Sequence, residues 1–191
     1  MDIYLIRHTQ TDTRKGLCYG QSDVKLATTF FDDVREILKK LNLPLFEGGR
    51  GDLLFSSPLS RCSRLAALIC DDVILDNRLL EVNFGDWENM PFAEIESEKL
   101  HHWTQNFVTL APPNGESFSE LCQRVERFWH DLIQHENERV FIVTHAGVIR
   151  ALLAVILQLP LANAFQFRVD CGSVHKLRHE NNYTYIEFLN L

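Results

Sequence analysis

The sequence predicts an α/β protein: a three-layer α/β/α sandwich around a mostly parallel sheet with one antiparallel edge. Short, almost wholly apolar segments alternate along the chain with longer segments in which apolar residues recur at helical spacing. Buried strands that alternate with helices are typical of parallel sheets covered by helices on both faces. The 191 residues, 46% of them hydrophobic and 24% charged, suit a single domain spanning residues 1–191 with its own core.

Strands are expected where short apolar runs stand between turn-forming residues. The first four runs contain almost no polar residue, as in strands that are buried on both faces. The expected strands lie at residues 3–6, 52–55, 73–75, 140–143, 165–169, 173–178 and 183–189. The last two flank Glu180, Asn181 and Asn182, which is the pattern of a β-hairpin.

Helices are expected between these strands. They run over about 30–41, 58–69, 118–132 and 146–157. Gly48, Gly49 and Gly51 break the chain before the second strand. Ser57 and Pro58 are expected to open the second helix, with serine as its N-cap. Ser117 and Glu120 form the pattern of a capping box at the start of the third.

The pattern changes between about residues 77 and 115. This segment holds Trp87 and Trp103, a helix-like set of apolar residues and the pair Pro112-Pro113. We expect a helical insertion that packs across the sheet and covers the active site, rather than a separate domain.

The charge of the chain limits its partners. The net charge of −7 argues against nonspecific binding of nucleic acid, which needs a basic surface. A small anionic substrate is still compatible, because a pocket can be locally positive on an acidic protein. No stretch approaches the roughly 18 apolar residues of a membrane span, and Asp2 stands where a signal peptide would be basic. A cytoplasmic protein without membrane contact is expected.

The cysteines and a histidine pair carry no metal signature. The five cysteines are scattered without a CxxC pair, so reduced and mostly buried thiols are expected. None stands beside an obvious base, which favours packing over nucleophilic roles. His101 and His102 are adjacent on an expected helix and therefore point apart, which favours an exposed pair over a metal site.

Cations and imidazoles follow three of the expected strands. Arg7 and His8 come directly after the first strand, Arg61 lies in the first turns of the helix after the second, and His145 follows the fourth. In open α/β sheets, ligands bind beyond the carboxyl ends of the strands. Guanidinium groups match phosphate oxygens, and helix N-termini supply N–H groups, so this edge of the sheet is expected to form a phosphate pocket.

The chemistry of such a pocket follows from its residue types. A histidine among cations can serve as a nucleophile and form a covalent phosphohistidine, because the surrounding positive charge keeps the imidazole neutral. The leaving oxygen then needs a proton. Candidates are the carboxylates in residues 81–88, which are interleaved with apolar side chains.

Four segments together resemble the histidine phosphatases, the phosphoglycerate mutase-like superfamily. Leu5-Ile6-Arg7-His8-Thr9 is similar to the family's first histidine motif, and residues 57–62 to its second arginine motif. Residues 81–88 resemble the acid-bearing segment, and residues 144–150 the second-histidine motif. The motifs occur in the family's order over residues 3 to about 178, and an ordered set of four is far more specific than an Arg-His pair alone.

The resemblance implies a phosphoglycerate mutase-like fold and a role for each matched residue. His8 is implied as the phosphorylated nucleophile and Glu81 as the proton donor, while Arg7, Arg61 and His145 would hold the phosphoryl group. No metal or other cofactor is implied. The expected substrate-binding residues are Thr11, Arg14, Tyr19, Gly20, Gln21, Thr144 and Ala146.

Within the superfamily, the chain is most similar to the α-ribazole phosphatases of cobalamin biosynthesis. Thr9 replaces the usual glycine after the nucleophile, and residues 16–24 follow the pattern of that group. The implied substrate is α-ribazole 5′-phosphate or cobalamin 5′-phosphate. The alternatives are a phosphoglycerate mutase or sugar-phosphate phosphatase, a metal-dependent hydrolase, and a non-catalytic module that binds a phosphorylated partner. Whether the chain forms a homodimer is left open.

Overall fold

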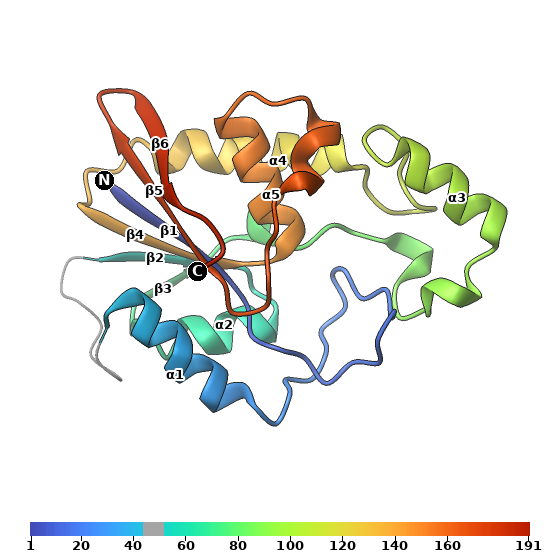
Figure 1. Cartoon of the computed structure of the whole chain (residues 1–191), viewed down its shortest axis with the longest axis horizontal. Coiled ribbons are helices and arrows are strands. Elements are labelled where there is room, and N and C mark those ends of the chain that lie inside the picture. The colour runs from blue at the N-terminus through green and yellow to red at the C-terminus, as the bar shows by residue number, and fades with distance from the viewer. Residues whose placement is uncertain (44–51) are drawn as a thin grey trace.

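A six-stranded sheet with the strand order β3-β2-β4-β1-β5-β6 runs through the molecule (Figure 1). The computed structural model describes residues 1–43 and 52–191. The strands are β1 (Asp2–Arg7), β2 (Leu53–Ser56), β3 (Val73–Leu75), β4 (Arg139–Thr144), β5 (Val174–Glu180) and β6 (Tyr183–Phe188). The first four are parallel to one another, and β5 pairs antiparallel with β1. The predicted mostly parallel sheet with an antiparallel edge is confirmed.

Helices cover both faces of this sheet (Figure 1). They are α1 (Phe30–Leu41), α2 (Ser60–Ala66), α3 (Ser97–Asn106), α4 (Phe118–Leu132) and α5 (Ala146–Ile156). One buried cluster joins α4 and α5 to the sheet, and a second joins α1 and α2 to its other face. The three-layer α/β/α arrangement is therefore confirmed. The predicted chain break at Gly48, Gly49 and Gly51 lies outside the described residues.

Residues 77–115 follow β3, lie outside the sheet and contain little regular structure apart from α3. Short 3₁₀ turns at Asn77–Leu79, Gly85–Trp87 and Phe92–Glu94 precede α3. Figure 1 shows α3 at the end of the molecule that lies away from the sheet. A small cluster of Cys18, Trp87 and Ile95 forms the centre of this part.

Two local predictions are confirmed. Ser117 and Glu120 form a capping box at the start of α4, with reciprocal side-chain to backbone hydrogen bonds. The hairpin between β5 and β6 turns at Asn181 and Asn182, whose φ values are +52° and +60°. Two consecutive residues with positive φ are typical of a tight type I′ turn, and asparagine tolerates this conformation well.

Two other predictions are wrong. Residues 165–169 do not form a strand: a 3₁₀ helix occupies Leu161–Gln166 directly after Pro160. The ring of Phe165 packs against Phe107 and Phe118 instead of joining a sheet. The N-cap of α2 is Leu59 rather than a serine, and no side chain caps it. The hydroxyl of Ser57 is used elsewhere, as described below.

No helix within residues 1–43 and 52–191 is long and apolar enough to cross a membrane.

Candidate active site

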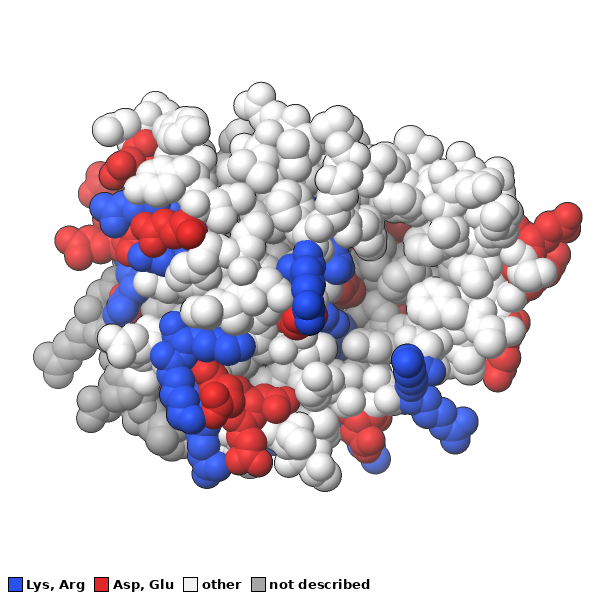
Figure 2. Space-filling view, in the orientation of Figure 1, with Lys and Arg blue, Asp and Glu red and all other residues white. Residues whose placement is uncertain are grey.

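The carboxyl ends of β1, β2 and β4 meet at one edge of the sheet and carry the predicted histidines and arginines. Arg7 pairs with Thr144 in the register of β1 and β4, so His8 and His145 emerge side by side. Their ring centroids are 5.2 Å apart. Arg61, on α2, donates a hydrogen bond to His145. Figure 2 shows both basic and acidic atoms around a hollow near the middle of one face of the molecule.

His8 is buried and its tautomer is fixed by the backbone. Its Nδ1 lies 2.7 Å from the carbonyl oxygen of Thr9. Because a carbonyl only accepts hydrogen bonds, Nδ1 carries the proton and Nε2 keeps a free lone pair. Burial, and then the charges of Arg61 and Arg7, lower the pKa of His8 to about 3. The imidazole is therefore neutral at physiological pH and able to act as a nucleophile.

His145 is also buried and neutral, but its tautomer is the opposite one. The Nε of Arg61 donates to Nδ1 of His145 over 3.2 Å, so the proton of the imidazole is on Nε2. That N–H donates to the hydroxyl of Ser57 over 2.8 Å. Burial is the largest cause that holds the pKa of His145 well below its usual range, and the charge of Arg61 acts in the same direction.

The guanidinium of Arg61 is fully buried and bonded mainly to backbone carbonyls. Its Nη1 donates to the carbonyl of Ser22 over 2.8 Å, and its Nη2 to that of Gly20 over 2.6 Å. The ring of Tyr19 lies 5.3 Å from the guanidinium carbon. Within the part of the chain that the structure describes, Arg61 makes no ion pair with a carboxylate. Its charge is left for an anion.

The guanidinium of Arg7, like that of Arg61, is bonded to a backbone carbonyl and makes no ion pair with a carboxylate among the described residues. Its Nη1 donates to the carbonyl of Val169 over 2.7 Å, and its Nε is buried without a hydrogen-bond partner among the described residues. A buried N–H of a cation without an acceptor is costly. An oxyanion bound between Arg7 and Arg61 would supply the missing acceptor and charge, and phosphate matches guanidinium geometry.

Glu81 lies at the N-terminus of α5, and its carboxylate is held by two backbone amides. Val82 N–H lies 3.0 Å from Oε1, and Gly147 N–H lies 3.2 Å from Oε2. Gln21 donates from Nε2 to the carbonyl of Glu81 over 2.9 Å, and Arg124 donates to the same carbonyl. The carboxyl group is thereby fixed beside the N-terminus of α5, next to a pocket.

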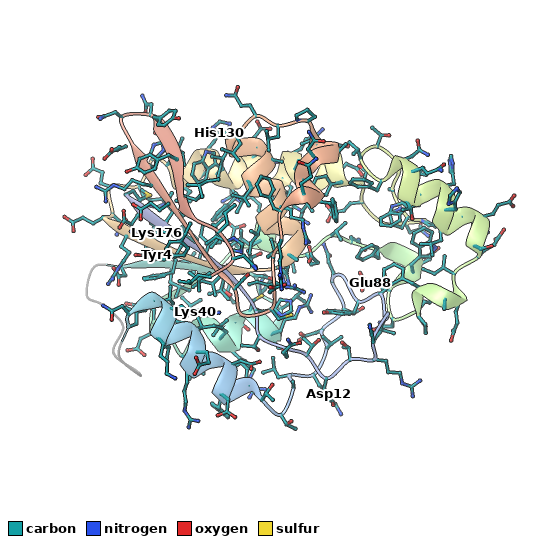
Figure 3. All side chains as sticks on the ribbon, viewed as in Figure 1. Tyr4, Asp12, Lys40, Glu88, His130 and Lys176 are labelled. Atoms are coloured by element: carbon teal, nitrogen blue, oxygen red, sulfur yellow. The ribbon has the colours of Figure 1, made fainter. Side chains whose placement is uncertain are left out.

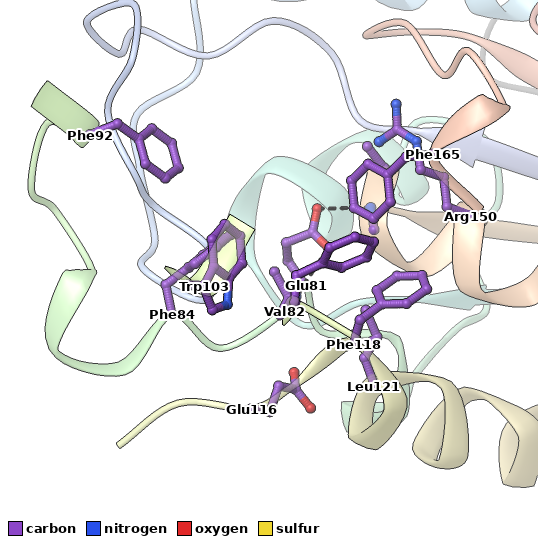
Figure 4. A pocket seen from close by; sticks show the side chains of 13 residues that line it. Glu81, Val82, Phe84, Phe92, Trp103, Glu116, Phe118, Leu121, Arg150 and Phe165 are labelled. Carbon is purple, nitrogen blue, oxygen red and sulfur yellow. Dashed lines mark hydrogen bonds between the residues drawn. The ribbon is translucent and has the colours of Figure 1, made fainter. Parts of the chain in front are cut away.

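This pocket has a volume of about 270 Å³, and Glu81 is one of the residues that line it (Figure 4). Most of its lining is aromatic or aliphatic, and its polar side chains are Glu81, Glu116 and Arg150. Glu116 is paired with Arg124. The Nε of Arg150 donates to the carbonyl of Phe167 over 3.1 Å. A group bound here would lie directly beside the carboxyl of Glu81.

The structure brings some of the predicted substrate-binding residues to the site and directs others elsewhere. Tyr19, Gly20 and Gln21 contact Arg61 or Glu81, and Ala146 lines the pocket. Thr144 is fully buried and donates its hydroxyl to the carbonyl of Leu79 over 2.8 Å.

Thr11 and Arg14 lie in the loop after β1. Thr11 bonds to Thr13 through its hydroxyl and forms a bridge with Leu26. Arg14 is exposed, and its carbonyl accepts the N–H of Leu17. Their contacts among the described residues are thus within that loop.

Glu88 holds the loop that binds Arg61, a role that the sequence did not assign. Its carboxylate accepts the N–H groups of Gln21 (2.8 Å), Ser22 (2.9 Å) and Phe84 (3.1 Å), and the hydroxyl of Ser22. Figure 3 shows Glu88 beside the segment that follows β1. A Cβ at Gly20 would overlap Glu88 and the carbonyl of Val82, so only glycine fits this approach. The glutamate's position in the acid-bearing segment was the signal available.

Ser57 and Cys62 are the other residues that were missed. Both contact Nε2 of His145, Ser57 through Oγ at 2.8 Å and Cys62 through Sγ at 3.5 Å. The expectation that no cysteine stands beside a base is therefore wrong for Cys62. Burial raises the pKa of its thiol, so it stays protonated and packs as a neutral group. The predicted exposure of His101 and His102 is confirmed, and no described cluster of three potential ligands suits a metal.

Two neutral imidazoles beside unpaired guanidiniums suit the binding and transfer of a phosphoryl group. The fold and this site together define an α/β enzyme of phosphoryl transfer. Comparison with protein families identifies the family of this enzyme. The chain belongs to the histidine phosphatase superfamily (branch 1), whose family model matches residues 3–191. It is a phosphatase.

Relatives with different named substrates are similar to this chain. It is 30% identical to the adenosylcobalamin/alpha-ribazole phosphatase of Escherichia coli, over 100% of this chain and 96% of the relative. It is 27% identical to phosphoserine phosphatase 1 of Hydrogenobacter thermophilus, over 73% of this chain and 70% of the relative.

Solved structures of phosphatases with different named substrates also resemble the structure of this chain. The alpha-ribazole phosphatase of Shigella flexneri has a TM-score of 0.87 at 28% identity, covering 100% of this chain and 96% of the other. A mycobacterial glucosyl-3-phosphoglycerate phosphatase has a TM-score of 0.84 at 25% identity, covering 99% and 98%. The phosphoglycerate mutase-like fold predicted from the motifs is confirmed.

Proposed function

We propose that the protein hydrolyses a small phosphomonoester through a phosphohistidine formed on His8. The observation that carries this proposal is the hydrogen bond from Nδ1 of His8 to Thr9, which leaves the Nε2 lone pair free. Beside it lie two guanidiniums that make no ion pair with a carboxylate among residues 1–43 and 52–191. A neutral imidazole next to an anion site is the arrangement that an attacking histidine requires.

In the first step, Nε2 of His8 forms a bond to phosphorus while the bond from phosphorus to the alcohol oxygen breaks. The carboxyl of Glu81 gives its proton to that oxygen, and the alcohol leaves through the pocket beside it. Arg7 and Arg61 hold the phosphoryl oxygens with N–H groups and charges that favour the transition state. His145 lies beside them, and because its one N–H donates to Ser57, it is proposed to position Arg61 rather than to donate to the phosphoryl group.

In the second step, water attacks phosphorus and the bond to Nε2 breaks. Glu81, now a carboxylate, takes the proton of the attacking water, so that inorganic phosphate leaves and the carboxyl is restored. The Nδ1–H of His8 stays bonded to Thr9 throughout, so the ring keeps its orientation in both steps.

Residues 77–115 are proposed to be an insertion within the single domain 1–191 that covers this site. Phe84, Phe92 and Trp103 from this segment line the pocket beside Glu81. The phosphate thus lies at the sheet edge, and the leaving group lies against the insertion.

For the physiological substrate, we propose α-ribazole 5′-phosphate or cobalamin 5′-phosphate, in a cytoplasmic setting. The 30% identity to the Escherichia coli enzyme over the whole chain supports this choice. Tyr19, Gly20, Gln21 and Ala146 are proposed to face the substrate. Hydrolysis of α-ribazole 5′-phosphate, assayed beside interconversion of 3-phosphoglycerate, separates this proposal from a mutase.

Trapping of the phosphoenzyme tests the nucleophile. Rapid quenching with ³²P-labelled substrate is expected to give a label that is labile in acid and stable in base, and that is absent from His8→Ala. His130→Ala is the matched control, because His130 is an exposed imidazole on α4 (Figure 3). Label retained in His8→Ala would disprove the assignment.

Two simple assays test the remaining alternatives. Turnover of p-nitrophenyl phosphate that disappears in His8→Ala rules out a module that only binds phosphate. Full activity after dialysis against EDTA rules out a metal-dependent hydrolase. Loss of activity that added metal restores would instead support one.

A further inference from the structure

The pocket beside Glu81 has a chemistry that selects among leaving groups. Its apolar lining is formed by Val82, Phe84, Phe92, Trp103, Phe107, Phe118, Leu121, Ala146 and Phe165. Six of these nine side chains are aromatic. Because the pocket begins at the proposed proton donor, the alcohol part of the substrate would enter it. The inference below therefore rests on the proposed function.

The aromatic side chains form two walls. In one wall, the ring of Phe84 contacts those of Phe92 (6.2 Å between centroids) and Trp103 (5.9 Å). In the other, Phe165 contacts Phe107 (5.0 Å) and Phe118 (5.4 Å). Figure 4 shows Glu81 and Val82 between these two walls. The pocket is therefore a slot with aromatic sides and a carboxyl group at its base.

One aromatic ring of the slot is exposed to solvent. Phe165 is 54% exposed although it is fixed on one side by its neighbours, and the guanidinium of Arg150 lies 5.1 Å from its centroid. Arg150 itself is anchored to the carbonyl of Phe167. A group bound in the slot would cover this ring and so remove its apolar surface from water.

The polar groups of the slot cannot satisfy a highly hydroxylated or acidic leaving group. Glu116 is occupied by Arg124 and by the N–H of Asn83. Among the described residues that line the slot, Arg150 is the one cation that could attract a substrate carboxylate. A leaving group that fills the slot with hydroxylated carbons alone would lose its hydrogen bonds to water without replacement, whereas a riboside can place its aromatic base there instead.

We infer that this slot binds a flat, apolar aromatic ring carried by the leaving alcohol. The substrate class is thus a phosphate ester of an aliphatic alcohol that bears an aromatic or heteroaromatic ring. Such a ring packs between the two walls and covers Phe165. Phosphoserine, phosphoglycerate and simple sugar phosphates are poor substrates by the same argument.

Primary alkyl phosphates with different tails test the inference directly. The series is 2-(1-naphthyl)ethyl phosphate, 2-cyclohexylethyl phosphate, propyl phosphate and phosphoserine, all of which lose an aliphatic alcohol. We expect kcat/KM to be on the order of tenfold or more higher for the naphthyl ester than for propyl phosphate, with phosphoserine the poorest. Equal values for the naphthyl and propyl esters would overturn the inference.

Variants locate the preference in the slot. Phe165→Ala and Phe92→Leu are expected to reduce the ratio of kcat/KM between the naphthyl and propyl esters about tenfold and about threefold, mainly through KM. Phe165 is exposed, so its replacement leaves the core intact. Phe31→Ala is the matched control, because Phe31 is 59% exposed on α1 and should leave the ratio unchanged. An unchanged ratio in Phe165→Ala would contradict the inference.

A binding measurement separates the slot from the chemistry. Calorimetric titration with 2-(1-naphthyl)ethanol needs no turnover, and the alcohol is expected to bind the wild type and to bind Phe165→Ala at least threefold more weakly. If no phosphate ester is hydrolysed, the proposed function fails while this result still supports the slot. If the esters are hydrolysed but the alcohol does not bind, the inference about the slot is wrong, while the proposed phosphatase function still holds.

Discussion

The Nε of Arg61 donates a hydrogen bond to Nδ1 of His145 over 3.2 Å, so a permanent cation directs its N–H at an imidazole. This contact is only favourable while His145 is neutral, because a protonated Nδ1 would place two donors and two charges against each other. It also sends the proton of His145 to Nε2 and so to Ser57. One guanidinium thereby sets the charge and the tautomer of the second histidine.

Removal of the Ser57 hydroxyl is expected to disturb this arrangement. In Ser57→Ala, the buried Nε2–H of His145 loses its acceptor, which should lower the free energy of unfolding by about 1–3 kcal/mol. We expect kcat for p-nitrophenyl phosphate to fall on the order of tenfold, because the imidazole that positions Arg61 is then no longer held in place.

Urea titrations and steady-state kinetics check both effects. Ser57→Thr keeps a hydroxyl and should recover most of the activity. Ser60→Ala serves as a control, since its hydroxyl bonds to Asp23 on the surface. Wild-type kcat in Ser57→Ala would show that His145 needs no acceptor at Nε2.

Replacement of the Glu81 carboxyl by an amide is expected to act selectively on poor leaving groups. Glu81→Gln should lower kcat/KM for alkyl phosphates on the order of 100-fold or more, because their alkoxide products need a proton. p-Nitrophenyl phosphate should lose much less, since nitrophenolate leaves without one. The two esters assayed on the same preparation give the comparison. Equal losses would argue against an acid role for Glu81.

Gly147→Ala is expected to separate activity from stability. A Cβ at position 147 would overlap Oε1 of Glu81, a flexible carboxylate that must then move. Alanine in place of glycine favours a helix by up to about 1 kcal/mol, which offsets the cost of displacing the carboxylate from the N–H of residue 147, so the free energy of unfolding should change little. Alkyl phosphatase activity should fall at least tenfold, since the acid is displaced.

Thermal melts and the same pair of esters test this. As in Glu81→Gln, the alkyl ester should suffer more than p-nitrophenyl phosphate. Gly16→Ala is a useful contrast, because nothing lies within 4 Å of its Cβ although its φ is +81°. It should lose stability rather than activity. An unaffected alkyl phosphatase in Gly147→Ala would mean that Glu81 tolerates displacement.

The protein is expected to lose stability as the pH falls from about 6.5 towards 4. His8, His145 and His175 are buried with lowered pKa values, about 3 for His8 and about 4 for His175. In this window the unfolded chain binds protons that the folded chain does not, so unfolding becomes easier as the pH falls. Each histidine contributes up to about 1.4 kcal/mol per pH unit.

His175→Gln isolates one of these contributions away from the reacting groups. Nδ1 of His175 accepts the N–H of Asn190, and its Nε2 lies 3.0 Å from the hydroxyl of Ser173, so the ring is neutral. Urea unfolding at pH 6.5, 5.5 and 4.5 should give a shallower slope in the variant than in the wild type. A wild-type stability that does not change between these pH values would contradict the prediction.

The layers of the fold could be predicted from the sequence because they depend on local patterns. Apolar runs and helical spacing located β1, β4 and α4, and paired asparagines located the hairpin. The strand predicted at 165–169 failed for a physical reason. Phe165 and Phe167 alternate with polar residues as in a strand, but Pro160 starts a 3₁₀ helix that ends on the pocket.

The site could be predicted only in part. His8, Arg61, Glu81 and His145 follow strands or stand in motifs, so chain order was enough to bring them together. The partners of these residues come from distant loops: Ser22 lies 39 residues from Arg61, and Ser57 lies 88 residues from His145. Neither the aromatic slot nor the contact of Cys62 with His145 has a local signal, because both depend on tertiary packing.

The unpaired guanidiniums of Arg7 and Arg61 have a consequence for the lifetime of the protein. Confined like charges raise the free energy of the folded state, and inorganic phosphate, the product of hydrolysis, would relieve it if it binds between them as proposed. Phosphate at 100 times its dissociation constant would stabilise the fold by about 2.7 kcal/mol. The same ion would therefore slow turnover and protect the chain from unfolding, so that a cell rich in phosphate would hold more of this enzyme in a less active form.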